Sequence, residues 1–129
     1  MTLNKRPIAA ADAPASAGGY PQALEATGAS RTLFISGQVP VASDGTLAPD
    51  FETQAAQVWA NVEAQLKAAD MSLDNLVKAT IFLADRAYAL PNRAARQAAL
   101  GDRQVALTVV IAGIFDAEWL LEIEAIAMA

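Results

Sequence analysis

The chain has 129 residues, enough for one domain with a substantial core, and 54% of them are hydrophobic. It contains neither cysteine nor histidine, which excludes disulfide bonds, thiol or histidine catalysis and the usual zinc and non-haem iron sites. Nine basic residues against fourteen acidic ones give a net charge of −5, which disfavours a nucleic-acid interface that tracks phosphate groups.

The N-terminal segment predicts two short strands joined by a loop. Residues 6–9 fit an edge strand because Pro7 cannot donate to a ladder, residues 10–19 have the composition of a loop, and residues 20–26 fit a second strand. No apolar segment follows the early pair of cations, and no apolar run approaches the roughly 18 residues of a membrane span. We therefore expect no signal peptide, and with the absence of cysteine this favours a cytoplasmic location.

A clear strand and a long helix come next. Residues 31–36 alternate and are rich in β-formers, and Gly37 follows directly, which leaves its backbone groups accessible before Pro40 ends the pairing. Asp50 can cap a helix, and helical periodicity then continues to residue 69. We interpret the apolar stripe of this helix as core packing rather than a binding surface. The stripe consists of Ala55, Val58, Val62, Leu66 and Ala69.

Three further elements follow the long helix. Residues 78–83 predict a strand. A second helix is expected from Pro91, which suits a first turn, to Leu100, with Gly101 as its stop. Residues 105–112 form a continuous apolar run, which predicts a strand buried on both faces.

The last predicted strand, residues 119–128, has two unlike faces. Apolar residues alternate with Glu122 and Glu124, which places both carboxylates on one face, roughly 7 Å apart. Because an unpaired buried carboxylate is costly, the acids belong either to an edge or structural hydrogen-bond network, or to a positioned acid/base group. The opposite face carries Leu121, Ile123 and Ala125.

The predicted elements follow the order βββ-α-β-α-ββ. This order favours an α+β sandwich in which one mixed sheet of about six strands carries two helices on one face, in a single domain over residues 1–129. The other sheet face also carries apolar residues, either Phe34 or its neighbours Leu33 and Ile35. An uncovered apolar face usually finds a partner chain, so we expect a homo-oligomer.

With these features the chain resembles the RidA/YjgF family of reactive imine and enamine deaminases, from about residue 6 to residue 127. No single motif is unique to that family, but six motifs in register favour its fold. The matching segments are Gly-Gly-Tyr-Pro-Gln-Ala at 18–23, Ile-Ser-Gly-Gln-Val-Pro at 35–40, Leu-Asp-Asn-Leu-Val-Lys at 73–78, the strand at 79–83, Asn92, and Glu-Ile-Glu-Ala-Ile-Ala at 122–127.

The resemblance implies a chorismate-mutase-like fold assembled as a trimer, with clefts between neighbouring subunits. In deaminating members water adds to a C=N bond, and ammonia leaves with a 2-keto acid, without a metal or organic cofactor. By resemblance, Glu122 positions the water, the backbone near Ser36 and Gly37 holds the imine, and Tyr20 and Asn92 line the cleft. We therefore expect a small-molecule ligand, a homotrimer, no cofactor, and neither a nucleic-acid nor a membrane partner.

One departure from the family pattern affects substrate binding. Deaminating members carry an arginine that holds the substrate carboxylate, and setting Thr108 against the family's threonine places Ala106 at the position of that arginine. Arg103 lies three residues earlier, about 10 Å away on an extended strand and on the opposite face, so it could replace the arginine only through a bulge or shifted register. Arg31 and Arg96 are further candidates without positional support.

Three hypotheses about function remain open at this stage. The first is a divergent imine or enamine deaminase whose substrate is altered by the loss of the arginine. The second is a non-catalytic, regulatory protein that binds a small metabolite in the same cleft. The third is a ribonuclease activity, which has been attached to the family, and the net charge and the absence of histidine weigh against it. Two variants, Ala106→Arg and Glu122→Ala, separate the first two hypotheses.

Overall fold

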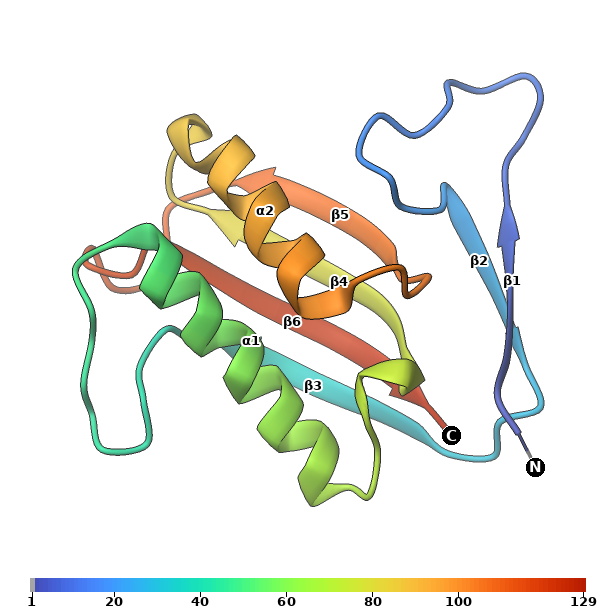
Figure 1. Ribbon diagram of the computed structural model, residues 1–129, viewed down its shortest axis with the longest axis horizontal. Helices are drawn as coiled ribbons and strands as arrows, with labels where there is room; N and C mark the ends of the chain where they lie inside the picture. Colours follow the sequence, from blue (N-terminus) through green and yellow to red (C-terminus); the bar gives the residue numbers. More distant parts are fainter. Residues whose placement is uncertain (1) are drawn as a thin grey trace.

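A computed structural model describes residues 2–129, and its elements confirm the predicted order βββ-α-β-α-ββ (Figure 1). Two short 3-10 helices, at Leu73–Asn75 and Arg86–Tyr88, lead into β4 and α2. The strands and α-helices are β1 (Asn4–Ile8), β2 (Ala23–Thr27), β3 (Thr32–Gln38), α1 (Phe51–Ala68), β4 (Leu76–Leu83), α2 (Ala89–Leu100), β5 (Ala106–Ile111) and β6 (Leu121–Met128).

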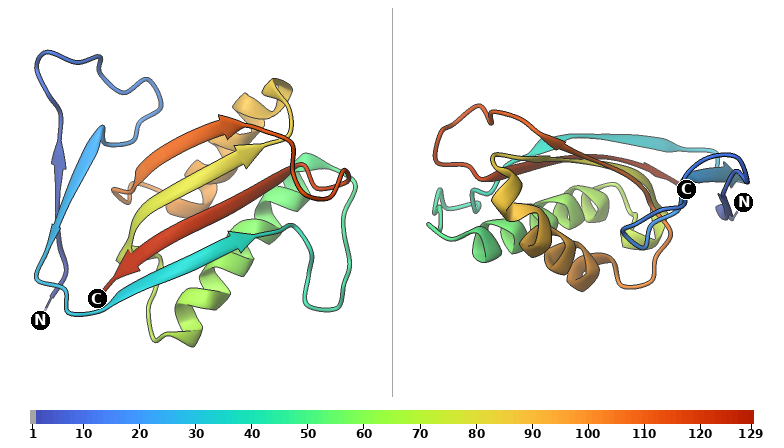
Figure 2. Two further views of the ribbon diagram at one scale, coloured as in Figure 1. Left: turned by 180° about the vertical axis from the view of Figure 1, so that it is seen from behind. Right: turned by 90° about the horizontal axis from the view of Figure 1, so that it is seen from above.

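The described strands form two sheets. Four of them make a mixed sheet in the order β3-β6-β4-β5, with β4 and β5 parallel and the other pairs antiparallel. Both helices lie on one face of this sheet (Figure 2), as predicted, but the sheet has four strands rather than about six. β1 and β2 form a separate antiparallel ribbon beside it.

The separation of the ribbon has a local cause. The chain turns at Gly28, whose positive φ of 81° an L residue rarely adopts, and it then leaves the ribbon. The N–H groups of Ser30 and Arg31 donate to the carbonyl of Ala129, at 2.9 and 2.7 Å. These bonds dock the start of β3 on the end of β6, so β3 pairs with the C-terminal strand rather than with β2.

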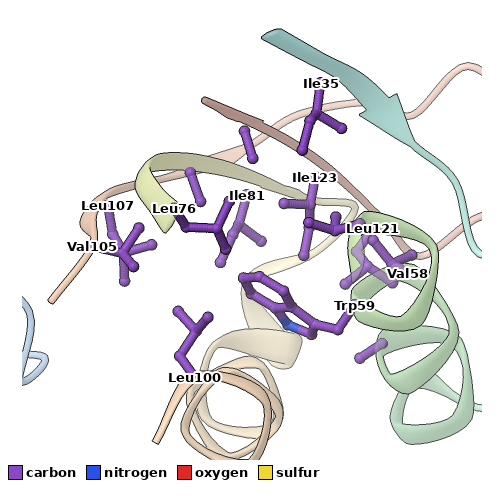
Figure 3. Packing of buried hydrophobic residues seen from close by; sticks show 14 of the residues in the cluster. Ile35, Val58, Trp59, Leu76, Ile81, Leu100, Val105, Leu107, Leu121 and Ile123 are labelled. Carbon is purple, nitrogen blue, oxygen red and sulfur yellow. The ribbon is translucent and has the colours of Figure 1, made fainter. Parts of the chain in front are cut away.

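The core lies between the sheet and the two helices (Figure 3). Asp50 caps α1, as predicted, because its carboxylate accepts from the N–H of Thr53 at 2.9 Å. Four residues of the predicted stripe, Ala55, Val58, Val62 and Leu66, are buried in the core, whereas Ala69 is half-buried and caps the C-terminal end of α1. The apolar face of β6 is buried as well, as predicted. α2 begins at Ala89, so Pro91 lies inside its first turn, and Gly101 caps its end.

β5 differs from its prediction. The apolar run at 105–112 was expected to be buried on both faces, but β5 is an edge strand that pairs with β4 alone. Val109 and Ile111 are therefore 44% and 39% exposed, and Thr108 is exposed as well. An edge position leaves one side of a strand without a neighbour, so an apolar run does not guarantee burial.

The sheet face opposite the helices is uncovered, and we call it the open face. Phe34 projects from it and is 75% exposed, so a large apolar side chain lies there in solvent. A shallow hollow on this face is lined by side chains of three strands. They are Phe34, Ser36, Lys78, Thr80, Glu124 and Ile126. None of the helices in residues 2–129 is long and apolar enough to cross a membrane.

Candidate functional site

The first candidate site forms where β3 meets the start of β6. The register changes from Ile35 opposite Ala125 to Gln38 opposite Ile123, so β3 holds one residue more than its partner there. This irregularity is a β-bulge, which leaves backbone groups of the extra residue without a ladder partner. Alternation within β3 does not reveal such a bulge, because it arises only from pairing with a strand far away in the sequence.

Gly37 lies in this bulge, directly against the carboxylate of Glu122. A Cβ atom built at Gly37 would collide with Oε2 of Glu122, so a larger residue would have to displace the carboxylate. The structure thus brings together two of the three residues that the family resemblance assigns to catalysis. Glycine at this position permits a side-chain acid to lie on the strand backbone.

Within the described residues, the Glu122 carboxylate makes no side-chain hydrogen bond and no ion pair. It is half-buried, and its neighbour on β4 is the apolar Phe82. The two predicted alternatives for this strand were a structural network or a positioned acid. An unpartnered, half-buried carboxylate beside a bulge fits the positioned acid, because it can still accept a hydrogen bond from water or a ligand.

Ser36 lies beside this pair, and its side chain is on the open face, the face of the sheet from which Glu122 also projects. It lines the hollow there together with Glu124 and Lys78, and its own carbonyl accepts from Nε2 of Gln38 at 2.9 Å. The predicted contribution of Ser36 was through its backbone, and Gln38 is a residue that sequence analysis missed. Its side chain also accepts from Gln65 of α1 at 3.3 Å, which ties the bulge to the helix.

The second cluster forms between α2 and the loop that joins β1 to β2. Nη2 of Arg96 donates to the carbonyl of Gly18 at 2.6 Å, and its guanidinium carbon lies 5.8 Å from the ring centroid of Tyr20. Gly18 is buried, and a Cβ atom there would overlap the Tyr20 ring. Burial lowers the pKa of Arg96, and the nearby cation Arg93 lowers it further.

Asn92 lies one turn before Arg96 on the same buried face of α2. It is 3% exposed, and its Oδ1 atom has no hydrogen-bond partner in the described residues. The family resemblance expected Asn92 to line a cleft. The structure places it next to the second cluster, beneath the surface, as a buried acceptor without a donor.

The residues of β5 lie far from Glu122 in the same chain. Ala106 pairs with Lys78, four positions along β4 from the Phe82 that faces Glu122, and β5 and β6 are two strands apart. Ala106 and Glu122 are therefore roughly 16 Å apart. Ala106 shares the open face with Lys78, whose Nζ donates to Thr108 Oγ1 at 2.7 Å. Lys78 is thus a cation near the position of the missing arginine.

Two of the other arginines already have partners. Arg103 pairs with Asp74 at 2.7 Å and donates to the carbonyl of Leu100, and the β4–β5 register runs from 106 to 111 without the bulge that its proposed rescue role requires. Arg31 donates to the carbonyl of Ala69 at 3.0 Å. Among the arginine candidates, Arg96 alone is brought next to a predicted site residue.

The predicted residues therefore form two clusters rather than one. Gly37 and Glu122 lie where β3 ends and β6 begins, whereas Tyr20 belongs to the loop that leads into β2, on the other side of the molecule (Figure 1). Within residues 2–129, no group of three acidic, histidine or cysteine side chains is arranged to hold a metal ion.

Comparison with known proteins fixes the family. Residues 10–129 match a family model described as Endoribonuclease L-PSP. This chain belongs to that family, which is also the RidA/YjgF family. A RutC family protein of Pyrococcus horikoshii is 33% identical over 126 residues, which cover 95% of this chain and 97% of that protein.

Two further members of the family bear on fold and activity. A Rid family protein of unknown function from Yersinia pestis, YyfB, has a crystal structure that matches 98% of this chain and 99% of its own, with a TM-score of 0.83 and 27% identity. A goat protein named 2-iminobutanoate/2-iminopropanoate deaminase is 41% identical over 86 residues. That match covers 65% of this chain and 61% of the goat protein.

Proposed function

We propose that this RidA-family protein is a hydrolytic deaminase of reactive imine or enamine metabolites, with a substrate preference altered by the loss of the strand arginine. The observation that supports it most is the unpartnered Glu122 carboxylate lying over Gly37. The name of the goat relative, an imino-acid deaminase, supports the reaction class. Because that match covers only part of each protein, the activity of this chain is our proposal.

The proposed reaction uses only groups that this chain supplies and water. The Glu122 carboxylate holds a water molecule and takes one of its protons as the oxygen attacks the C=N carbon. Glu122 passes that proton to the imine nitrogen, which gives a carbinolamine. The carboxylate then moves the hydroxyl proton of the carbinolamine to the amine nitrogen as the C–N bond breaks, so a C=O group forms and ammonia leaves. Backbone groups of the bulge at Ser36 and Gly37 hold the imine, since a bulge leaves such groups free of the ladder.

We further propose that the working site is shared between subunits of a homotrimer. In one chain the two clusters lie on different sides of the molecule, so a neighbouring chain is needed to bring Tyr20 close to Glu122. The exposed Phe34 on the open face supports such an assembly, because burying it against another chain removes apolar surface from water.

Ammonia release tests the proposal directly. 2-Iminobutanoate, 2-iminopropanoate and an imine without a carboxylate, each generated in place from its amine by an oxidase, are presented to the wild type and to Ala106→Arg. We expect the wild type to accelerate the hydrolysis of at least one imine. We expect Ala106→Arg to shift the preference towards the two imino acids, because it adds a fork-shaped donor for a carboxylate.

The alternative is a non-catalytic protein that binds a small metabolite in the same shared cleft. The alanine at position 106 favours this alternative, because without an arginine there the cleft lacks a two-pronged donor that would hold an imino acid in place for turnover. It would be supported by saturable binding of an imino or keto acid with no acceleration of hydrolysis for any imine in the panel.

A further inference from the structure

Arg96 is a buried cation without a counter-ion. It is 8% exposed, and none of the three ion pairs of the described residues includes it. Its guanidinium donates one hydrogen bond, to the neutral carbonyl of Gly18. Removing a charge from water is expensive unless an opposite charge or several hydrogen bonds compensate it, so this arrangement leaves Arg96 under-satisfied.

Within residues 2–129, no carboxylate lies at ion-pair distance from Arg96. Its neighbours are the Tyr20 ring, the neutral Asn92 and the like-charged Arg93, although the chain as a whole is acidic. The Nε and Nη1 atoms donate to no acceptor in the described residues, and neither is among the fully buried unpaired atoms, so both retain contact with solvent. Both N–H groups can therefore still donate to a ligand.

We propose that Arg96 binds the carboxylate of a small organic acid and that Tyr20 covers the adjoining carbon atoms. A guanidinium presents parallel N–H groups that match the two oxygens of a carboxylate. This inference rests on the proposed function in one respect, since it makes Arg96 the residue that specifies acid substrates for that site. Arg96 lies in the helical layer and Ala106 on the open face, so Arg96 supplies a carboxylate ligand from a different place.

A purely structural role must be distinguished from this one. The hydrogen bond to Gly18 also anchors the loop before β2, so removing Arg96 can loosen Tyr20 without any loss of a ligand contact. The two roles differ in what they predict for neutral molecules. Loosening the loop weakens every ligand, whereas losing the guanidinium weakens acids selectively.

The test is a binding titration, which does not require turnover. The probes are 2-oxobutanoate and its neutral counterpart 2-butanone, followed by chemical shifts or calorimetry, with the wild type, Arg96→Met, Arg96→Lys and the control Arg93→Met, which changes an exposed arginine of the same helix. We expect Arg96→Met to weaken 2-oxobutanoate by about 10- to 100-fold and leave 2-butanone unchanged. Arg96→Lys should weaken the acid less, because it keeps the charge and loses the fork.

Several results would overturn the inference. Equal weakening of both probes in Arg96→Met means a structural role, and unchanged acid binding means that Arg96 is not the ligand. If Arg93→Met weakens the binding of 2-oxobutanoate as much as Arg96→Met does, the effect is one of overall positive charge rather than of a specific ligand. If no imine is hydrolysed but the acid still binds through Arg96, the deaminase proposal fails and the carboxylate site stands. If imines are hydrolysed with no selective loss for acids in Arg96→Met, the carboxylate site fails alone.

Discussion

The contact between Gly37 and Glu122 leads to a prediction at the scale of single residues. In Gly37→Ala the new methyl group meets the end of a flexible side chain, so the carboxylate moves aside and the strand stays folded. We expect the free energy of unfolding to fall by about 1 kcal/mol at most. Imine hydrolysis should fall on the order of 100-fold, because a displaced catalytic group is costly.

Urea unfolding and ammonia release measure the two effects of Gly37→Ala. Gly113→Ala is the matched control, because a Cβ atom there meets nothing within 4 Å and its φ is not positive. It should leave both quantities near wild type. Full hydrolytic activity in Gly37→Ala would contradict the role assigned to the contact.

The residue scale also shows what the sequence could predict of the site. Alternation placed Glu122 away from the core, and the structure agrees. It could not show that Gly37 lies beneath that carboxylate, since the bulge depends on pairing between distant strands. The sequence also contains a pattern that predicts the burial of Arg96. Asn92, Arg96 and Leu100 recur every four residues, which places the arginine on the buried face of its helix.

At the scale of elements, the cap of α1 makes stability depend on pH. Thr53 donates to the Asp50 carboxylate and holds the pKa of Asp50 below its ordinary value of 3.8. Because the pKa is lower in the folded state, the stabilisation is present at neutral pH and is lost as the pH falls from about 3.8 through the folded value.

Asp50→Asn keeps a capping oxygen but cannot titrate. We therefore expect its unfolding free energy to fall less than that of the wild type between neutral pH and about pH 3, as measured by urea unfolding across that range. Asp12→Asn, in an exposed loop, is the control and should follow the wild-type curve. Parallel curves for Asp50→Asn and the wild type would refute the assignment.

The β1–β2 ribbon gives a second prediction at this scale. Lys5 of β1 donates to the carbonyls of Leu76 and Gln104, at 3.0 and 2.9 Å, and so links the ribbon to the main sheet. Burial lowers the pKa of Lys5. In Lys5→Met we expect amide hydrogen exchange to become faster in β1 and β2, with β4 and β6 as protected as before. Unchanged exchange in the ribbon would show that other contacts hold it.

The element scale also explains which parts of the fold were predictable. Local signals such as the Asp50 cap and the alternation in β6 depend only on neighbouring residues, and the structure confirms the predictions made from both. The division into two sheets depends on the pairing of residues 30–31 with Ala129, far apart in the sequence, which local patterns do not contain. The edge position of β5 likewise depends on the order of strands in the sheet, so the prediction from the apolar run at 105–112 that this strand is buried on both faces was wrong.

At the scale of the whole molecule, the exposed side chain of Phe34 tests the proposed assembly. We expect the wild type to sediment with about three times the chain mass of 13.5 kDa, and Phe34→Asp to sediment as a monomer, because a charge cannot be buried at the interface without a partner. Phe115→Asp is the control, since Phe115 is 96% exposed and lies in the loop before β6 rather than on the open face.

Loss of imine hydrolysis should accompany the loss of assembly in Phe34→Asp, because the two clusters of one chain lie too far apart to act together. Phe115→Asp should keep both the wild-type mass and the wild-type rate. A wild-type protein that sediments as a monomer, or a monomeric Phe34→Asp variant with full activity, would refute the shared site.

The measurement that tests the central claim most directly compares Glu122→Gln with Glu124→Gln, using the imine that the wild type hydrolyses fastest. Both changes remove one carboxylate from the same face of the same strand, but Glu122 is half-buried over the bulge, whereas Glu124 is exposed. We predict that Glu122→Gln loses about 100- to 10,000-fold in rate, as expected for a lost acid/base group, with Glu124→Gln near wild type. Equal activity of Glu122→Gln and the wild type would contradict the account.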